Sequence, residues 1–210
     1  MLPALRNLRE GGKGGLAFRL SLFILTATAF IFLTAFGYSY FYSRKQILAN
    51  VEKNAEAVTM ATVSKIEVVL EGVAKVPSYL ARNLQGDKPS LPVLQQQIIA
   101  LLQTNPEIFG SAVAYEPYAY EARSRYFAPY ICRGKYGGLV PTFLGNEEYQ
   151  YFFLDWYQLP KELDRAVWSE PYFDEGAGNI MMSTYSVPFY TYREGEKIFT
   201  GIVTADISLE

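Results

Sequence analysis

The sequence has no histidine and a single cysteine, Cys132, among its 210 residues. Without histidine the chain cannot form a Ser-His-Asp or Cys-His catalytic site, a histidine-ligated zinc or haem site, or a phospho-accepting histidine. One thiol excludes an intramolecular disulfide and a multi-thiolate metal site, and Cys132 is most simply a small buried hydrophobic residue. We therefore expect no metal, no cofactor and no catalytic residue in this chain.

Charged residues are also scarce, at 19% of the chain, and they are unevenly distributed. Residues 1–50 hold six Lys or Arg and one acidic residue, whereas residues 51–210 hold thirteen basic and twenty acidic residues. An acidic body argues against nucleic acid as a partner, because phosphate neutralisation requires a basic surface. Half of the residues are hydrophobic, which excludes a disordered chain and suits one globular domain with a more apolar segment.

The apolar segment is a run of 24 residues without a charge, from Leu20 to Ser43, bounded by Arg19 and Arg44. A helix of this length spans about 36 Å, enough to cross a hydrocarbon core of about 30 Å. Four aromatic residues at its end favour the headgroup region: Tyr38, Tyr40, Phe41 and Tyr42. A cleavable signal peptide is the alternative, but its apolar region would be shorter, and no clear small-x-small cleavage site follows. We predict a transmembrane helix over residues 20–43.

The residues before this helix are rich in Lys and Arg, although Arg44, Lys45 and Lys53 partly balance them on the other side. Because basic residues favour the cytoplasmic side, we expect residues 1–19 to form a cytoplasmic tail. The body of the protein is then extracytoplasmic.

The pattern of residues 44–88 predicts one long stalk helix after the membrane helix. Mostly apolar residues recur at intervals of three and four: Val51, Ala55, Val58, Thr62, Ile66, Val69, Val73, Val76 and Leu80. This stripe fits a helix packed on its own domain and equally a two-helix seam between protomers of a homodimer. Pro77 lacks a backbone donor and is expected to kink or break the helix.

Residues 89–210 predict a second helix followed by an antiparallel sheet. Ser90 is a candidate N-cap and Pro92 lies in the first turn, and Asn105 with Pro106 ends the helix. The residues expected to face the core are Leu91, Leu94, Ile98 and Leu101 or Leu102. Aromatic and β-branched runs then predict strands at residues 108–115, 126–132, 181–190 and 197–207, with a turn at 193–196 between the last two. The fold class is α+β, and the sheet needs a helical cover on its core face.

Polar and aromatic residues are densest at residues 149–157, 168–174, 183–185 and 204–206. Aromatic rings beside carboxylates can hold a cation, through cation–π attraction and charge-assisted hydrogen bonds. For any single Tyr or Asp, a core ring or a solvated acid is the simpler interpretation. Asp206 is different because it interrupts the apolar run 198–203, where an unpaired carboxylate would be costly. Trp168 and the turn at 170–171 are expected to shape the mouth of such a pocket, and Asp155 is a candidate third acid.

The order of these segments resembles an extracytoplasmic tandem Cache sensor, which is PAS-like. The resemblance rests on the two helices, Trp156-Tyr157, residues 168–174 (WSEPYFD), 184–189 (TYSVPF) and 201–209 (GIVTADISL). Residues 105–117 (NPEIFGSAVAYEP) and 176–180 (GAGNI) resemble more narrowly the Cache regions of bacterial SpoIIE-type serine/threonine phosphatases. The resemblance implies a bacterial inner-membrane location, with residues 89–210 as the membrane-distal Cache module. It also implies a second module, a returning membrane helix and an output domain beyond Glu210.

Amino-acid-binding Cache domains carry a Tyr, then Arg-x-Trp-Tyr, then Tyr-x-Asp, then a late Asp. The positions of this sequence that match are Tyr149, Trp156, Tyr157, Tyr172, Asp174 and Asp206, whereas Leu154 stands at the position of the arginine. That arginine is expected to hold the carboxylate of an amino acid, and leucine has neither charge nor donor. The resemblance therefore implies a small amine-bearing or amino-acid-like ligand, held by the two acids between aromatic walls.

Three functions remain open at this stage. The favoured one is a ligand-sensing receptor region that signals through the long helix, with a phosphatase, histidine kinase, cyclase or chemoreceptor output. The second is a ligand-free structural module that sets dimer geometry. The third is a membrane-anchored enzyme with paired carboxylates, for example Asp155 with Asp174 or Glu170 with Asp174, acting in the manner of a glycosidase.

Overall fold

The computed structural model describes residues 15–86 and 88–210. Most of the predicted cytoplasmic tail lies outside the described residues. Contacts divide the chain into two units, one reaching Val63 and the other running from Ser64 to Glu210.

Helix α1 (Leu16–Asn83) is 68 residues long and contains both the predicted membrane segment and the predicted stalk. Its N-terminal part is long and apolar enough to cross a membrane. Threonine side chains there bond within the helix: the hydroxyl of Thr26 donates to the carbonyl of Leu22 at 2.9 Å, and that of Thr28 donates to the carbonyl of Ile24. Hydroxyls satisfied in this way are compatible with a hydrocarbon environment.

Of the two effects expected of Pro77, a kink or a break, the break is absent, because α1 continues through it to Asn83. Pro77 is buried, and its neighbours Val73, Leu80 and Ala81 lie in the hydrophobic core of the second unit. The proline removes the backbone donor for the carbonyl of Val73, and the hydroxyl of Ser78 donates to the next carbonyl, that of Ala74, at 2.7 Å. Packing in the core thus outweighs the missing backbone hydrogen bond.

The apolar stripe of α1 is buried only near its end. Val73 is 0% exposed and Leu80 is 6% exposed, whereas Val58 is 67% exposed and Val69 is 47% exposed. Packing of the stripe on its own domain is therefore confirmed for the last turns. The exposed part upstream is compatible with the predicted seam between protomers, which stays a prediction.

Helix α2 (Leu91–Thr104) begins and ends where the sequence predicts. Ser90 occupies the N-cap position with extended backbone, but its side chain makes no capping hydrogen bond. At the other end, the guanidinium of Arg133 donates to the carbonyls of Leu102 at 2.6 Å and Asn105 at 3.1 Å. Arg133 thereby satisfies carbonyl groups at the C-terminal end of the helix.

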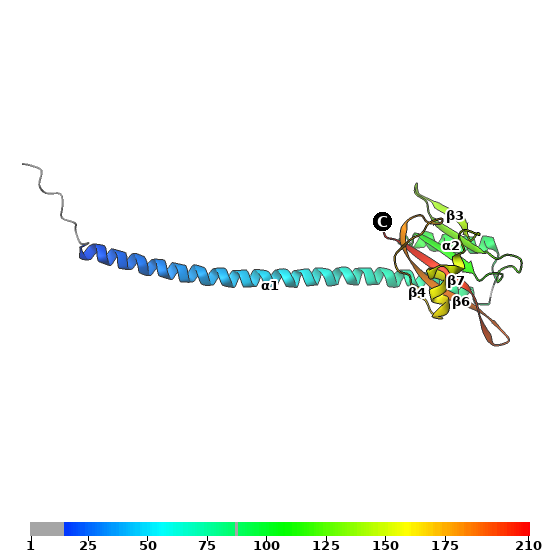
Figure 1. Cartoon of the computed structure of the whole chain (residues 1–210), viewed down its shortest axis with the longest axis horizontal. Coiled ribbons are helices and arrows are strands. Elements are labelled where there is room, and N and C mark those ends of the chain that lie inside the picture. Colours follow the sequence, from blue (N-terminus) through cyan, green and yellow to red (C-terminus); the bar gives the residue numbers. More distant parts are fainter. Residues whose placement is uncertain (1–14, 87) are drawn as a thin grey trace, which may run out of the picture. The chain divides into compact units, whose positions relative to one another are not determined.

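The sheet is antiparallel and has the strand order β3-β2-β1-β7-β6-β4, with β5 also paired to β6 (Figure 1). Its strands are β1 (Gly110–Tyr115), β2 (Ala128–Arg133), β3 (Leu139–Leu144), β4 (Val167–Trp168), β5 (Tyr172–Phe173), β6 (Met181–Arg193) and β7 (Glu196–Ser208). The four predicted strands correspond to β1, β2, β6 and β7. Glu194 and Gly195 have positive φ angles of 53° and 87°, as a tight hairpin turn between β6 and β7 requires.

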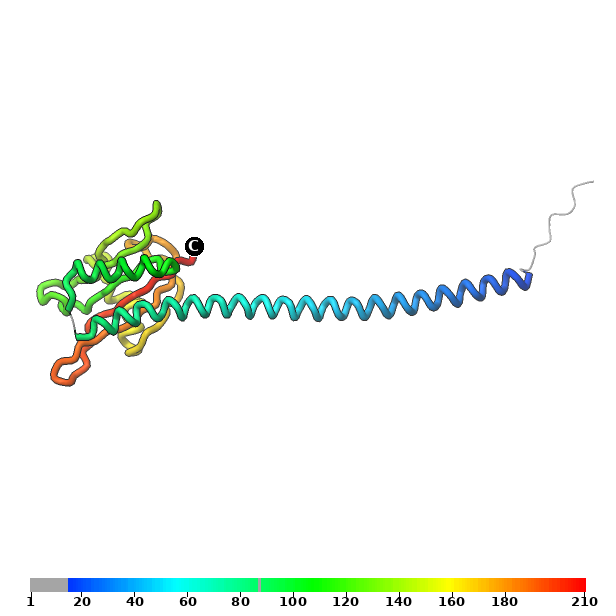
Figure 2. Tube along the Cα trace, turned by 180° about the vertical axis from the view of Figure 1, so that it is seen from behind, coloured from blue at the N-terminus to red at the C-terminus, as the bar shows by residue number. Residues whose placement is uncertain are grey.

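Both faces of the sheet are covered. The last turns of α1 together with α2 lie on one face, and the 3-10 helix η1 (Tyr151–Phe153) with α3 (Asp155–Glu162) lies on the other (Figures 1 and 2). We call these the helix face and the aromatic face. The predicted α+β fold, an antiparallel sheet with a helical cover, is confirmed. The second cover, η1 and α3, was not predicted.

Candidate ligand-binding site

Strand β7 places one carboxylate on the aromatic face. Side chains alternate along a strand, so Val203 and Ala205 pack into the helix-face core while Thr204 and Asp206 point to the opposite side. Asp206 is only 4% exposed. Its Oδ1 accepts a hydrogen bond of 2.9 Å from the Thr184 hydroxyl on the neighbouring strand β6.

A second carboxylate, Asp174, follows β5 and is 5% exposed. The backbone N–H of Gly178 donates to its Oδ2 at 2.7 Å, and the hydroxyl of Tyr149 donates to its Oδ1 at 3.0 Å. A Cβ atom at Gly178 would lie 2.6 Å from the Cε of Met182, so only glycine fits without displacement. The loop after β5 therefore fixes Asp174 beside Asp206.

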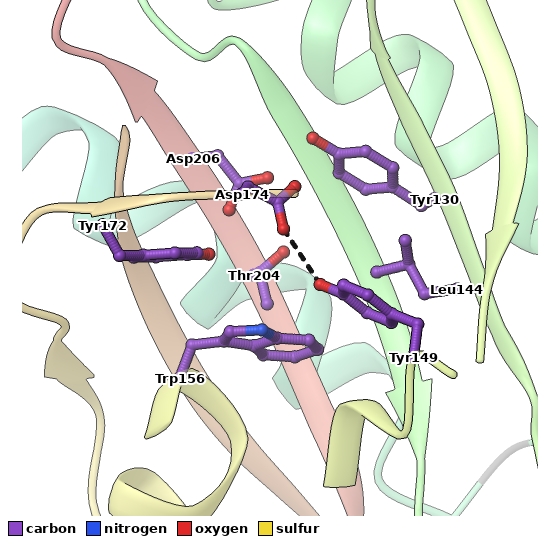
Figure 3. A pocket seen from close by; sticks show the side chains of 8 residues that line it. All are labelled: Tyr130, Leu144, Tyr149, Trp156, Tyr172, Asp174, Thr204 and Asp206. Atoms are coloured by element: carbon purple, nitrogen blue, oxygen red, sulfur yellow. Dashed lines mark hydrogen bonds between the residues drawn. The ribbon is translucent and has the colours of Figure 1, made fainter. Parts of the chain in front are cut away.

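The two carboxylates border a cavity of about 10 Å³, which is the room of a single water molecule. We call it the inner cavity, and its lining residues are Tyr130, Leu144, Tyr149, Trp156, Tyr172, Asp174, Thr204 and Asp206. The polar ends of these side chains converge (Figure 3). None of these eight residues is basic, so the lining provides two acids and no counter-charge.

Two donors at the inner cavity have no partner among the described residues. These are the indole Nε1 of Trp156 and the hydroxyl of Tyr130, on side chains that are 4% and 2% exposed. Buried polar groups normally have a hydrogen-bond partner, and an unsatisfied one costs about 1–3 kcal/mol. The site thus has unused hydrogen-bonding capacity as well as unbalanced charge.

Burial raises the pKa of Asp206 to about 7; a hydrogen bond from Thr184 opposes the rise and the nearby charge of Asp174 adds to it. The pKa of the Tyr149 hydroxyl is also raised, by burial and then by Asp174, and that of Tyr172 by burial and then by Asp206. These rings therefore stay neutral and act as donors. The carboxyl group of Asp206, by contrast, is stabilised by a proton or by a bound cation, because burial disfavours its ionised form.

Of the six predicted ligand-binding residues, the structure brings five together: Tyr149, Trp156, Tyr172, Asp174 and Asp206. Tyr157 does not line the inner cavity. Its hydroxyl instead donates to Glu116 Oε2 at 2.8 Å, and Lys161 pairs with the other oxygen of the same carboxylate at 2.8 Å. These bonds tie α3 to the end of β1.

Two further residues that the sequence assigned to the site do not line the inner cavity. Asp155 is exposed at the start of α3 and does not join the acid pair. Trp168 packs against the helix-face core, with its ring centroid 5.0 Å from that of Tyr185, so it does not shape the mouth of the inner cavity. The turn formed by Glu170 and Pro171, in contrast, lines a groove beside that cavity.

We call this second space the outer groove; it has a volume of about 360 Å³. Its lining residues are Phe153, Leu154, Asp155, Trp156, Leu159, Ser169, Glu170, Pro171 and Tyr172. Trp156 and Tyr172 line both spaces, so the two rings separate the inner cavity from the outer groove. Leu154, at the position where the resemblance implied an arginine, belongs to the outer groove.

The sequence reasoning missed Tyr130 and Leu144 as lining residues. Tyr130 lies on β2 between Ala128 and Cys132, and all three belong to the aromatic-face cluster. The alternation of side chains along β2 predicts that Tyr130 points to the same side as these two residues. The sequence alone did not show that this side is the aromatic face. Leu144 ends β3, a strand that was not predicted, so no signal placed it at the site.

Comparison with known proteins gives the family. Residues 94–210 match the family described as methyl-accepting chemotaxis protein-like, first PDC sensor domain. No curated protein matches the sequence significantly. Among solved structures, the extracellular domain of soHK1S-Z6, a protein classed as a histidine kinase, is 29% identical with a TM-score of 0.61. That match covers 70% of this chain and 56% of that domain, so the chain spans little more than half of the relative's length.

Two chemoreceptor structures share the fold at lower identity. Methyl-accepting chemotaxis protein X is 19% identical with a TM-score of 0.65, over 78% of this chain and 64% of that one. The ligand-binding domain of the Pseudomonas aeruginosa PAO1 amino acid chemoreceptor PctC, in complex with GABA, is 19% identical with a TM-score of 0.51, over 76% and 61%. The predicted Cache-type sensor fold is thus confirmed, and the chain belongs to the family of methyl-accepting chemotaxis protein-like first PDC sensor domains.

Proposed function

We propose that this chain is the extracytoplasmic ligand-sensing region of a membrane receptor and binds a small amine-bearing metabolite in the inner cavity. One observation carries the proposal: Asp174 and Asp206 are almost fully buried at one cavity whose lining has no basic residue. A ligand ammonium group would supply the missing positive charge. Charge-assisted hydrogen bonds to the carboxylates and cation–π attraction to Trp156 would then favour binding.

The inner cavity holds only about 10 Å³, which admits an ammonium group, so the rings that close the cavity have to move aside for the rest of the ligand. We expect the ligand to displace the hydroxyl of Tyr149 from Asp174 Oδ1 and to take over that hydrogen bond. Such a movement gives two states of the aromatic face with different affinities for the ligand, which is the requirement for a signal.

The proposed signal passes through the sheet to α1. Asp206 lies on β7 next to Ala205, whose side chain belongs to the core that contains Val73 and Leu80 of α1. A change in the position of β7 therefore alters the packing of the last turns of α1. We propose that α1 carries this change toward the membrane.

Calorimetric titration of the full chain in detergent micelles with amines, amino acids and simple carboxylates tests the ligand class. We expect amines to bind, and Asp206→Asn to abolish their binding. Tight binding of a carboxylate that has no amine would refute the proposal. Glu162→Gln serves as the matched control, because Glu162 is exposed on α3 and lines neither the inner cavity nor the outer groove.

A ligand-free structural module is the second candidate, and the small volume of the inner cavity favours it. In that case Asp206 keeps its proton, and the side chains that line the cavity fill it. Failure of every amine to bind to the full chain, together with unchanged signalling in the Asp206→Asn variant, would favour this alternative.

The membrane topology, the homodimer and the output also belong to the proposal. We propose residues 1–19 as the cytoplasmic tail, 20–43 as the membrane helix, 44–88 as the stalk and 89–210 as the sensor module. The family and the soHK1S-Z6 relative favour a chemoreceptor or histidine kinase output. A SpoIIE-type phosphatase output has no support from these comparisons.

The exposed part of the α1 stripe is the proposed dimer contact. Val58 is 67% exposed, as a residue at an unoccupied helix–helix seam would be in a single chain. Val58→Cys should form a disulfide between protomers in membranes under mild oxidation. The native Cys132 is buried and should not form one. A cysteine on the opposite side of the same turn is the control, and equal cross-linking there would argue against a specific seam.

A further inference from the structure

The inner cavity and the outer groove share one wall. The rings of Trp156 and Tyr172 line both spaces and border the inner cavity on the side away from Tyr130 (Figure 3). When these two rings move apart, a ligand held by the buried acids reaches the outer groove. Two acidic side chains, Asp155 and Glu170, line that groove, and we call them the acidic rim.

We propose that the site selects linear diamines. One primary ammonium group enters the inner cavity between Asp174 and Asp206, the carbon chain passes the rings of Trp156 and Tyr172, and the second ammonium group meets the acidic rim. This inference rests on the proposed function and adds the length and the two charges of the ligand to it.

The size of the inner cavity limits the ligand's first group. Its volume of about 10 Å³ admits one group of the size of a water molecule. A primary ammonium has that size and three N–H donors, which match the carboxylates of Asp174 and Asp206 and the hydroxyl oxygen of Tyr130. A trimethylammonium group is much larger and has no donor, so this cavity discriminates against it.

The outer groove determines what the rest of the ligand can be. Leu154, Leu159 and Pro171 provide apolar surface for a carbon chain. None of the nine lining residues is basic, so a ligand carboxylate would find no partner there and would meet the negative charge of the acidic rim. The same features that suit a second ammonium group therefore disfavour an α- or ω-amino acid.

Four compounds of the same carbon chain length test this inference on the full chain in detergent micelles: diaminopentane, pentylamine, aminopentanoate and pentyltrimethylammonium. We expect diaminopentane to bind about fivefold tighter than pentylamine, because ion pairs at an exposed rim contribute modestly. Aminopentanoate should bind more weakly than pentylamine, and pentyltrimethylammonium should not bind. The advantage of the diamine should decrease at high salt, because exposed charges are screened.

Variants separate this inference from the proposed function. Glu170→Gln should remove most of the diamine advantage and leave pentylamine binding unchanged, whereas Glu162→Gln, on α3 but outside both spaces, should change neither. Equal affinity for diaminopentane and pentylamine, or tighter binding of aminopentanoate, would overturn the diamine inference while the amine-binding function stands. Absence of binding by every amine would overturn both.

Discussion

The two faces of the sheet differ in how they use the same strands. On the helix face, α2 and the last turns of α1 bury an almost continuous apolar core, with Leu94, Ile98 and Leu102 each 0% exposed. On the aromatic face, η1 and α3 bury rings together with two carboxylates and unpartnered donors. The helix face is therefore where the fold gains stability, and the aromatic face is where it retains binding capacity at a cost in stability.

In strand β7, neighbouring residues contribute to different faces of the sheet. Val203 and Ala205 serve the helix face, while Thr204 and Asp206 serve the aromatic face one residue along. A register shift of one residue would place the carboxylate in the apolar core. Function and stability thus depend on neighbouring residues, and variants on each face should separate them.

The largest effect is expected from a cavity in the helix face. Ile98→Ala removes a side chain that is 0% exposed, and it should lower the free energy of unfolding by about 2–5 kcal/mol. Denaturant titration of the full chain, followed by fluorescence of Trp156 and Trp168, measures this. Val93→Ala, on the exposed side of the same helix, should change stability by only about 0.5 kcal/mol. Similar losses at both positions would contradict the proposed division between the faces.

On the aromatic face, Asp206→Asn should raise the free energy of unfolding in the absence of ligand, whereas Ile98→Ala should lower it. The pKa of Asp206 rises from 3.8 to about 7 on folding, so between these pH values the folded protein binds more protons than the unfolded protein. The stability that protonated Asp206 contributes to the folded protein is fully present below about pH 4 and is lost as the pH rises through about 7. It amounts to about 4 kcal/mol in the free energy of unfolding. The amide oxygen that Asp206→Asn introduces keeps the acceptor for Thr184 without the charge.

The measurement is the free energy of unfolding from about pH 4 to 8 for both proteins. We expect the wild-type stability to fall relative to that of Asp206→Asn over this range, and the variant to be more stable at about pH 8. A variant that is less stable at every pH would show that the ionised carboxylate is already paired in the folded protein.

Ligand binding should depend on pH for the same reason. A cation binds the ionised form of Asp206, and an alkylammonium group stays protonated to well above neutral pH. The affinity for an amine should therefore rise about tenfold per pH unit up to about pH 7 and then level off. Calorimetry across this range measures it. An affinity that is independent of pH would mean that Asp206 does not take part.

The sequence predicted the fold largely because its strongest signals are local. The period of apolar residues, Pro92 and Asn105 gave α2, and the strands that were predicted are those with long aromatic and β-branched runs. Strand β3 was missed because it is an exposed edge strand with Pro141 in its interior, so its pattern is neither alternating nor strongly apolar. Helix α3 was missed because it has only eight residues and includes Pro160, so its helical period is too short to stand out.

The candidate site was predictable only in part. Asp206 was identified because a carboxylate in an apolar run needs a partner, and Asp174 followed from the resemblance to a family. Tyr157 was misplaced because it lies next to Trp156 in a helix, where adjacent residues point in directions about 100° apart. The packing of α3 on the sheet determines which of these two residues points into the cavity. The hydrogen bond from Tyr157 to Glu116 helps to fix that packing.

A smaller effect is expected where the backbone makes room for the cavity wall. A Cβ atom at Gly110 would fall on the ring of Tyr130, so Gly110→Ala should displace this ring and cost about 1–3 kcal/mol. Gly72→Ala is the matched control, because its Cβ meets nothing within 4 Å in helix α1, and it should stabilise the protein by about 0.5–1 kcal/mol. Amine affinity should fall only in the first variant, and an unchanged affinity would remove Tyr130 from the proposed site.

The smallest effect is expected from removing two buried tyrosine hydroxyls, one on each face of the sheet. The hydroxyl of Tyr149 donates to Asp174, so Tyr149→Phe leaves a buried carboxylate with one partner fewer and should cost about 1 kcal/mol. The hydroxyl of Tyr115, in the helix-face core, has no partner among the described residues, and Tyr115→Phe should be neutral or stabilising. Denaturant titration of both variants measures the difference. Equal losses would mean that the Tyr149 hydrogen bond contributes nothing specific, and the aromatic face would then differ from the helix face only in its charges.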